Sequence, residues 1–460
     1  MAVRIVCAAL AVCGLGLHGV ARADFSKALK DYNAGQYESA HAQFLALAEL
    51  GDCPSQFNLG AMALKGQGVP KDRGAGVGWL QAALSNGCRE QVGDRVPALA
   101  ATLTPEESRA AAAIMARYGH DALQSQGVLS PTFECRDLMP AAVLDTPTPE
   151  YPKAQRNGHA DAIVITAFTI GVDGLARDPE ILLATPATGF PAAAVEAWLN
   201  SRFAPAQRHG VVVESRLQAK LRFMGATGSL ANATLFKTAL PAAQNGDPAA
   251  QYTVGLAASF DPSLGVTQAR SGQMLISSAR AGNPDGQYWV ASQVRAAGGC
   301  QPPASGTTWL RHAAESGSPS AQVVLAHELL KGAPSAAQVS EARALLASAG
   351  NSDSYYVQKH AVALLAASPV AEVNDPAAAL RIANKLLAGE IQSDPQMFEA
   401  VAAAYAANKD FDLASAKQDI AVKKARTLGW NTRLMKERLS AYEQGHPWSG
   451  DLFALPPLSL

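Results

Sequence analysis

The sequence of 460 residues lacks a long apolar run outside its N-terminus. After residue 23, no stretch reaches the roughly 18 consecutive apolar residues that are typical of a membrane span. Charge of one sign is also scarce, because 38 Lys and Arg residues nearly balance 39 Asp and Glu residues. A chain this close to neutral shows no electrostatic preference for nucleic acid. We therefore expect a soluble mature chain that binds neither DNA nor RNA.

Motifs of the common catalytic and nucleotide-binding sites are also missing. The chain has no G-x-x-x-x-G-K-[ST] loop, no G-x-S-x-G elbow and no G-x-G-x-x-G between a strand and a helix. His327-Glu328 begins like the zinc motif H-E-x-x-H, but Lys331 stands where the second imidazole is needed. His312 and Glu315 lie one helical turn apart, and the sequence places no third ligand near them. We predict no enzymatic activity, no metal site and no cofactor.

The first 23 residues have the layout of a secretory signal peptide. Arg4 precedes an apolar run over residues 5–17, and Ala21-Arg22-Ala23 forms a small-x-small cleavage site. The run is shorter than the roughly 20 residues that cross a bilayer. We predict a periplasmic protein that is secreted through this signal. If residues 1–23 are instead retained, the chain is anchored in the inner membrane and faces the periplasm.

The mature chain repeats itself. Gly51-Asp52-Cys53-Pro54 recurs in form as Gly246-Asp247-Pro248, Gly282-Asn283-Pro284 and Gly317-Ser318-Pro319, and Gly87 begins a weaker copy. These glycines lie 36, 36 and 35 residues apart within their groups, a period that indicates a solenoid of helix pairs. In each unit a glycine ends one helix, and Asp, Asn or Ser then caps the next helix, with Pro in its first turn.

The fullest copy resembles a Sel-one-like repeat, a relative of the tetratricopeptide repeat. It carries Leu59-Gly60, the Gly66-x-Gly68-Val69 turn, and Trp79 ahead of Ala82-Ala83 and Gly87. The resemblance implies a scaffold for protein contacts. We expect Trp79, Trp198 and Trp309 to pack in the core. The predicted helical regions are the Sel-like repeats at 24–125 and 239–365, the tetratricopeptide-like helices and cap at 366–446, and a tail at 447–460.

Four cysteines lie beyond the signal, and none of them forms a C-x-x-C pair, which counts against a zinc knuckle or a redox motif. Cys53 and Cys88 follow equivalent glycines in successive repeats, so a disulfide between them is conceivable. Stacked helices lie about 8–10 Å apart, however, and a disulfide needs Cα atoms within about 7 Å. The sequence therefore leaves this pairing open.

An insert of different character separates the two repeat arrays. A Pro-containing linker is predicted at 126–144, and a second linker at 226–238. Between them, apolar residues alternate over 162–172, Asp173-Gly174 marks a tight turn, and residues 175–184 form the returning strand. A helix is expected at 191–201, and clean alternation over 211–223 gives a last strand. The insert is thus strand, strand, helix, strand.

Residues 145–225 resemble the TonB C-terminal domain. The resemblance rests on a Tyr-Pro pair, the Phe-Thr-Ile-Gly-Val-Asp-Gly-Leu hairpin, a Phe-Pro helix start and an Arg-Phe-Ala-Pro-Ala segment at matching spacing. The fold class is therefore α + (α+β), with two helical hairpin solenoids flanking a small TonB C-terminal-like domain. The matching residues are Tyr151, Pro152, Phe168, Asp173, Gly174, Phe190, Ala194, Phe203, Pro205, Ala206 and Gly210.

The resemblance implies a partner and a mechanism. TonB C-terminal domains bind an extended segment of an outer-membrane transporter as an added strand at the sheet edge, where main-chain hydrogen bonds supply affinity. We expect such a segment, an inner-membrane motor component or a second copy of this chain as partner. Two alternatives remain: a membrane-anchored energy transducer and a pure interaction scaffold. The candidate docking residues, on one face of the last strand, are Glu214, Arg216, Gln218, Lys220 and Arg222.

Overall fold

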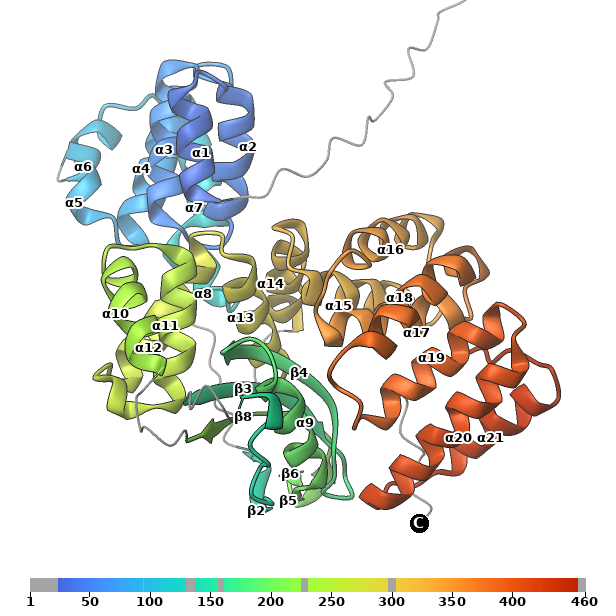
Figure 1. Ribbon diagram of the computed structural model, residues 1–460. Coiled ribbons are helices and arrows are strands. Elements are labelled where there is room, and N and C mark those ends of the chain that lie inside the picture. Colours follow the sequence, from blue (N-terminus) through green and yellow to red (C-terminus); the bar gives the residue numbers. More distant parts are fainter. Residues whose placement is uncertain are drawn as a thin grey trace, which may run out of the picture.

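The computed structural model describes residues 24–93, 95–129, 137–155, 161–224, 231–296 and 303–453. The predicted signal at 1–23, as well as Cys135 and Cys300, lie outside these ranges. The described chain is mostly helical, with one small group of strands packed beside the helices (Figure 1). No helix in the described part of the chain combines the length and the apolar character that crossing a membrane requires.

The first array consists of antiparallel helices joined by short turns. Asp52 caps α3 by accepting a hydrogen bond from the Ser55 N–H, as the repeat pattern predicts. Gly66 ends the same helix with a φ of 74°, a left-handed conformation that favours glycine. The helices are α1 (Phe25–Asn33), α2 (Tyr37–Ala48), α3 (Cys53–Lys65), α4 (Arg73–Ser85), α5 (Arg89–Val92), α6 (Arg95–Ala100), α7 (Pro105–Tyr118) and α8 (His120–Ser125).

The second array continues the same design. Asp247, Ser318 and Asp394 cap helices that begin with proline, again through their side-chain oxygens. Its helices are α10 (Ala231–Gln244), α11 (Pro248–Phe260), α12 (Gln268–Arg280), α13 (Pro284–Ala296), α14 (Pro303–Glu315), α15 (Pro319–Leu329), α16 (Ala336–Ala349), α17 (Tyr355–Ala367), α18 (Pro376–Ala388), α19 (Pro395–Ala407), α20 (Phe411–Leu428) and α21 (Arg433–Glu443).

The two arrays pack against each other although the insert separates them in sequence (Figure 1). The Phe25 N–H donates to the Ala281 carbonyl at 3.3 Å, and the Arg280 guanidinium donates to the Leu129 carbonyl. Leu50 and Leu129 belong to the same apolar core as Leu275 of the second array. The two arrays therefore form one continuous helical body, and the insert packs beside it. The predicted core positions of Trp79, Trp198 and Trp309 are confirmed, since their side chains are buried.

The insert contains a three-stranded antiparallel sheet in the order β4-β3-β8, with α9 (Phe190–Asn200) on one face. β3 (Ala162–Ile170) and β4 (Ala176–Thr185) form the predicted hairpin, and Gly174 in its turn has a φ of 72°. β8 (Ser215–Phe223) pairs with β3 along its whole length. The predicted order of strand, strand, helix and strand is thus present in the structure.

The structure differs from the sequence-based interpretation at the borders of the insert. The expected strand at 211–223 breaks at Glu214 into β7 (Val211–Val213) and β8. Part of the expected linker at 126–144 forms strands, and α10 begins inside the expected linker at 226–238. Strands this short show no periodicity that a sequence could reveal. β1 (Leu138–Met139) pairs with β6 (Ala206–Arg208), which also pairs with β7, and β2 (Ala142–Asp145) pairs with β5 (Arg202–Ala204).

Candidate binding site between the sheet and the second array

One face of the sheet is apolar and covered by α9. Phe168 stacks on Trp198 with ring centroids 5.1 Å apart, and Phe203 lies 5.4 Å from Phe168. Tyr151 meets Phe190 edge to face at 5.3 Å. Most of the apolar residues that carry the family resemblance therefore form this core, and their role is packing. Buried among them are Phe168, Phe190, Ala194, Phe203 and Ala206.

The remaining residues of the resemblance shape turns. The Asp173 carboxylate forms an ion pair with Arg177 at 2.6 Å and accepts the Leu175 N–H, which fixes the hairpin. A Cβ at Gly174 would collide with the Phe203 carbonyl, so only glycine fits there. Gly210 has a φ of 79° in the turn between β6 and β7. Pro152 and Pro205 are partly buried in connecting segments.

The other face of the sheet carries the predicted docking side chains, and they contact the protein itself. Arg216 pairs with Glu180 of β4 at 2.5 Å, and Gln218 accepts a hydrogen bond from the Trp289 indole of α13 at 3.3 Å. Lys220 pairs with Asp261, which follows α11, at 3.3 Å, and Arg222 pairs with Asp161 at 3.5 Å. The alternating charge therefore marks an internal contact, in which the second array lies against the sheet.

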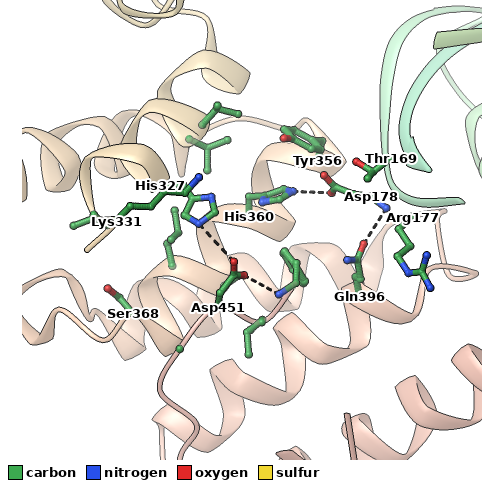
Figure 2. A pocket seen from close by; sticks show the side chains of 18 of the residues that line it. Thr169, Arg177, Asp178, His327, Lys331, Tyr356, His360, Ser368, Gln396 and Asp451 are labelled. Atoms are coloured by element: carbon green, nitrogen blue, oxygen red, sulfur yellow. Dashed lines mark hydrogen bonds and ion pairs between the residues drawn. The ribbon is translucent and has the colours of Figure 1, made fainter. Parts of the chain in front are cut away.

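A buried charge cluster joins this face to α17 and α19, and Figure 2 shows its contacts from Asp178 to His360 and Gln396. The Lys359 ammonium is fully buried between Asp178 of β4 at 3.0 Å and Asp394 at 2.9 Å. The His360 Nε2 atom lies 2.7 Å from the same Asp178 carboxylate. Burial alone would raise the pKa of Asp178, but His360 and Lys359 hold that pKa below its usual range. The cluster ties the insert to the array.

The backbone at Asp178 is adapted to this contact. Asp178 has a φ of 52°, unusual for a residue other than glycine, and its N–H donates to the Gln396 side chain at 2.9 Å. The register between β3 and β4 shifts at this point of the strand. Sequence analysis missed the cluster because its residues lie about 180–220 positions apart, which no local pattern records.

Two adjoining hollows remain between the sheet and the array. The larger has a volume of about 620 Å³ and lies between the sheet, α15, α17 and the segment from Gly450 to Phe453. The smaller, of about 450 Å³, shares several lining residues with it and extends toward β1 and β7. The shared residues are Thr169, Glu214, Arg295, Val324 and Tyr356. The hollows together form a groove along one end of the sheet.

Glu214 is the predicted docking residue that lines this groove without an ion pair or hydrogen bond to any residue that the structure describes. It stands at the break between β7 and β8. Desolvation raises the pKa of Glu214; the charge of Arg177 opposes this rise, and the carboxylates of Asp178, Asp173 and Asp451 add to it. An open acidic group in a groove can accept a hydrogen bond from a ligand main chain or pair with a cation. Within the described ranges, no group of three or more His, Cys, Asp or Glu side chains could hold a metal ion.

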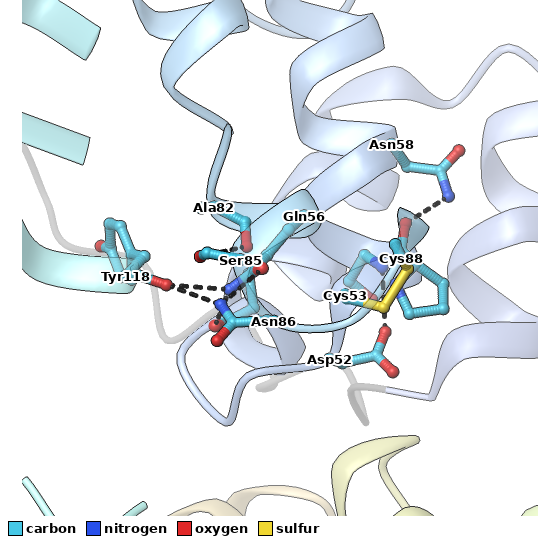
Figure 3. Close-up of a disulfide and its surroundings, with 12 residues drawn as sticks. Asp52, Cys53, Gln56, Asn58, Ala82, Ser85, Asn86, Cys88 and Tyr118 are labelled. Carbon is cyan, nitrogen blue, oxygen red and sulfur yellow. Dashed lines mark hydrogen bonds between the residues drawn. A yellow bond between two sulfur atoms is a disulfide. The ribbon is translucent and has the colours of Figure 1, made fainter. Parts of the chain in front are cut away.

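Far from the groove, Cys53 and Cys88 form a disulfide in the first array (Figure 3). Their Cα atoms are 5.6 Å apart, closer than stacked helix axes, because both cysteines lie at the ends of helices. Gln56 and Asn86 donate hydrogen bonds to the Tyr118 carbonyl at 3.2 and 2.9 Å beside it. The bridge therefore joins two repeats at a point where α7 is also attached.

Known proteins similar to this chain are found among solved structures. No family model matches the chain, and the search of curated proteins found no match. Among solved structures, one similar chain is described as c5321, a protective antigen present in uropathogenic Escherichia coli strains that displays an SLR fold. It is 15% identical, the alignment covers 91% of this chain and 82% of that one, and the TM-score is 0.32.

Proposed function

We propose that this chain is a protein-binding scaffold of the cell envelope in which β8 accepts an extended partner segment as an added strand. One observation carries the proposal. β8 pairs with β3 over nine residues without a register shift, and no strand that the structure describes pairs with its other edge. The unpaired N–H and C=O groups of such an edge are a template for a further strand.

The two edges of the sheet are protected to different degrees. β4 contains Pro179, two shifts in its register with β3, and the Asp178 N–H bound to Gln396. These are the devices by which proteins block unwanted pairing at an edge. β8 contains no proline and no bulge. Its charged side chains are paired within the protein. β8 is therefore the edge suited to a partner.

The partner class follows from the resemblance of residues 145–225 to TonB C-terminal domains. It would be a segment from the periplasmic side of an outer-membrane transporter. The main chain of such a segment would pair with β8, and its end would reach Glu214 and the groove. A membrane-anchored energy transducer would also need residues 1–23 to be retained. The intact mass of the exported chain decides this point, because a mass beginning at Met1 in the membrane fraction supports the anchored form.

The test uses synthetic peptides of about 8–10 residues, the length of a strand, from periplasm-facing transporter segments. Successive N–H groups of a strand point to opposite edges, so Leu217→Pro and Gln218→Pro remove one inward and one outward donor. One of the two variants loses an N–H that points to the free edge; it should keep the pairing with β3 and bind about tenfold more weakly. The other loses an N–H that bonds to β3 and should be clearly less stable than Gln218→Ala.

Gln218→Ala is the matched control, since it removes the side chain and keeps the N–H. It should bind as the wild type does. If the wild-type chain binds no peptide, or if both proline variants fold and bind unchanged, strand addition at β8 is wrong. The remaining function would then be that of a pure scaffold, in which the insert only braces the arrays.

A further inference from the structure

The C-terminal segment occupies a surface of the second array that is separate from β8. After α21 the chain turns back, and residues 450–453 lie against α15 and α17 (Figure 2). The Gly450 N–H donates to the Ala367 carbonyl at 2.8 Å. Leu452 is buried, with 2% of its surface exposed. The segment from Pro447 to Phe453 has no helix or strand of its own.

Several residues of the segment contact the array. The Asp451 carboxylate lies 3.8 Å from His327 Nε2, and the Asp451 carbonyl accepts a hydrogen bond from Arg438 at 3.3 Å. The Phe453 ring meets His360 edge on at 5.0 Å, with the Lys359 ammonium 5.5 Å from its centroid. The segment bends here, and the Asp451 side chain also accepts the Phe453 N–H at 2.9 Å. This surface therefore accommodates a carboxylate followed by two apolar residues in a bent segment.

We propose that this surface, formed by α15, α17 and α19, is a second binding site for a short segment of a partner protein. The partner segment would carry an acidic residue followed by a Leu-Phe-like apolar pair and would bend as residues 450–453 do. Residues 447–453 fill the site while no partner is bound.

Two features support an exchangeable occupant. The segment is held by separate contacts and not by a helix or strand of its own: one main-chain hydrogen bond to α17, the buried Leu452, the ring of Phe453 and a hydrogen bond from Arg438. The hollow of about 620 Å³ lies directly beside it, so a longer ligand has room to continue toward the sheet. Lys331 lines that hollow, is exposed, and forms no ion pair with any described residue, so it offers a further cation to an acidic ligand.

The probe is a fluorescent peptide with the sequence of residues 447–453, titrated into the full chain. When residues 447–453 occupy the site, the apparent affinity for the added peptide is the intrinsic affinity multiplied by the fraction of molecules whose site is open. The double variant Leu452→Ser/Phe453→Ser should therefore bind the peptide about tenfold or more tightly than the wild type does. A peptide in which Ser replaces both the Leu and the Phe residue should not bind. A peptide with Asn in place of the aspartate should bind more weakly.

Circular dichroism and melting curves establish that each variant is folded. The proposal is overturned if folded tail variants do not bind the peptide, or if the peptide with Ser in place of both Leu and Phe binds equally well. It is also overturned if the wild type forms a dimer that Leu452→Ser/Phe453→Ser abolishes, because the occupant would then be a second copy. Gln218→Pro should not alter this binding, so the result is independent of strand addition at β8.

Discussion

The two faces of the sheet are built in opposite ways. The face under α9 consists of apolar rings, among which Phe168 and Trp198 stack at 5.1 Å. The face under the second array buries Ile163 and Ile165 but also carries arginine, lysine and carboxylate groups, and Lys359 of α17 is fully buried there between two aspartates. The first face is made within the insert, and the second is completed by the second array, from α11 to α19.

The difference shows how burial can be misjudged from a strand pattern. Alternation in β8 correctly divides its residues between the two faces. Charge on one face normally indicates solvent, yet here that face meets complementary charges. Charged groups become buried only where partners compensate for their desolvation, and such partners can come from anywhere in the chain.

The largest effect is expected from the apolar face. Phe168→Ala removes a fully buried ring from between Trp198 and Phe203, so the free energy of unfolding should fall by about 3–5 kcal/mol. Urea unfolding measures this change. Leu144→Ala is the control, because Leu144 is an exposed residue of the same domain and should have little effect. Equal losses in both variants would contradict the assignment of the core.

On the charged face, Lys359→Met leaves Asp178 and Asp394 without their shared cation. Breaking a buried pair in this way costs about 3 kcal/mol or more at neutral pH. The loss should shrink in mild acid, because the uncompensated carboxyl groups then take up protons. The triple change Lys359→Met/Asp178→Asn/Asp394→Asn should recover much of the stability. If stability is not recovered, the three charged groups stabilise the fold beyond offsetting one another's desolvation.

Acid should separate the two faces. The folded-state pKa of Asp178 is below its unfolded value near 3.8, so this carboxylate stabilises the fold above about pH 4 and the effect is lost on further acidification. The face under α9 should not respond. Fluorescence reports on the two faces in two variants of the chain. One keeps Trp289 as its only tryptophan, and the other keeps Trp198. A simultaneous response of both probes would contradict this prediction.

His312 must be controlled in that experiment. Burial lowers the pKa of His312 to about 4, so its neutral form stabilises the fold above pH 6.5 and this contribution is lost between pH 6.5 and 4. The residue lies between the arrays, 3.6 Å from Glu49. The acid titration is therefore done in a His312→Gln background, which removes this earlier transition.

The smallest effect concerns the hydrogen bond between Trp289 and Gln218. Gln218→Ala should lower the free energy of unfolding by about 1 kcal/mol, the usual value for one hydrogen bond. A double-mutant cycle with Trp289→Phe isolates the pairwise term. A coupling energy near zero would show that the hydrogen bond between Trp289 and Gln218 does not contribute to the stability of the contact between the sheet and α13.

The sequence by itself determined the repeat architecture, the helix caps, the strand order of the insert and the apolar residues under α9. Each of these depends on neighbours within one turn, one hairpin or one repeat, so the period of the pattern records it. Tertiary structure alone decided that the charged face of β8 is covered, that Asp178, Lys359 and Asp394 meet, and that residues 450–453 return to α17. Ion pairs and chain returns across such distances depend on how whole elements pack, and no local pattern records them.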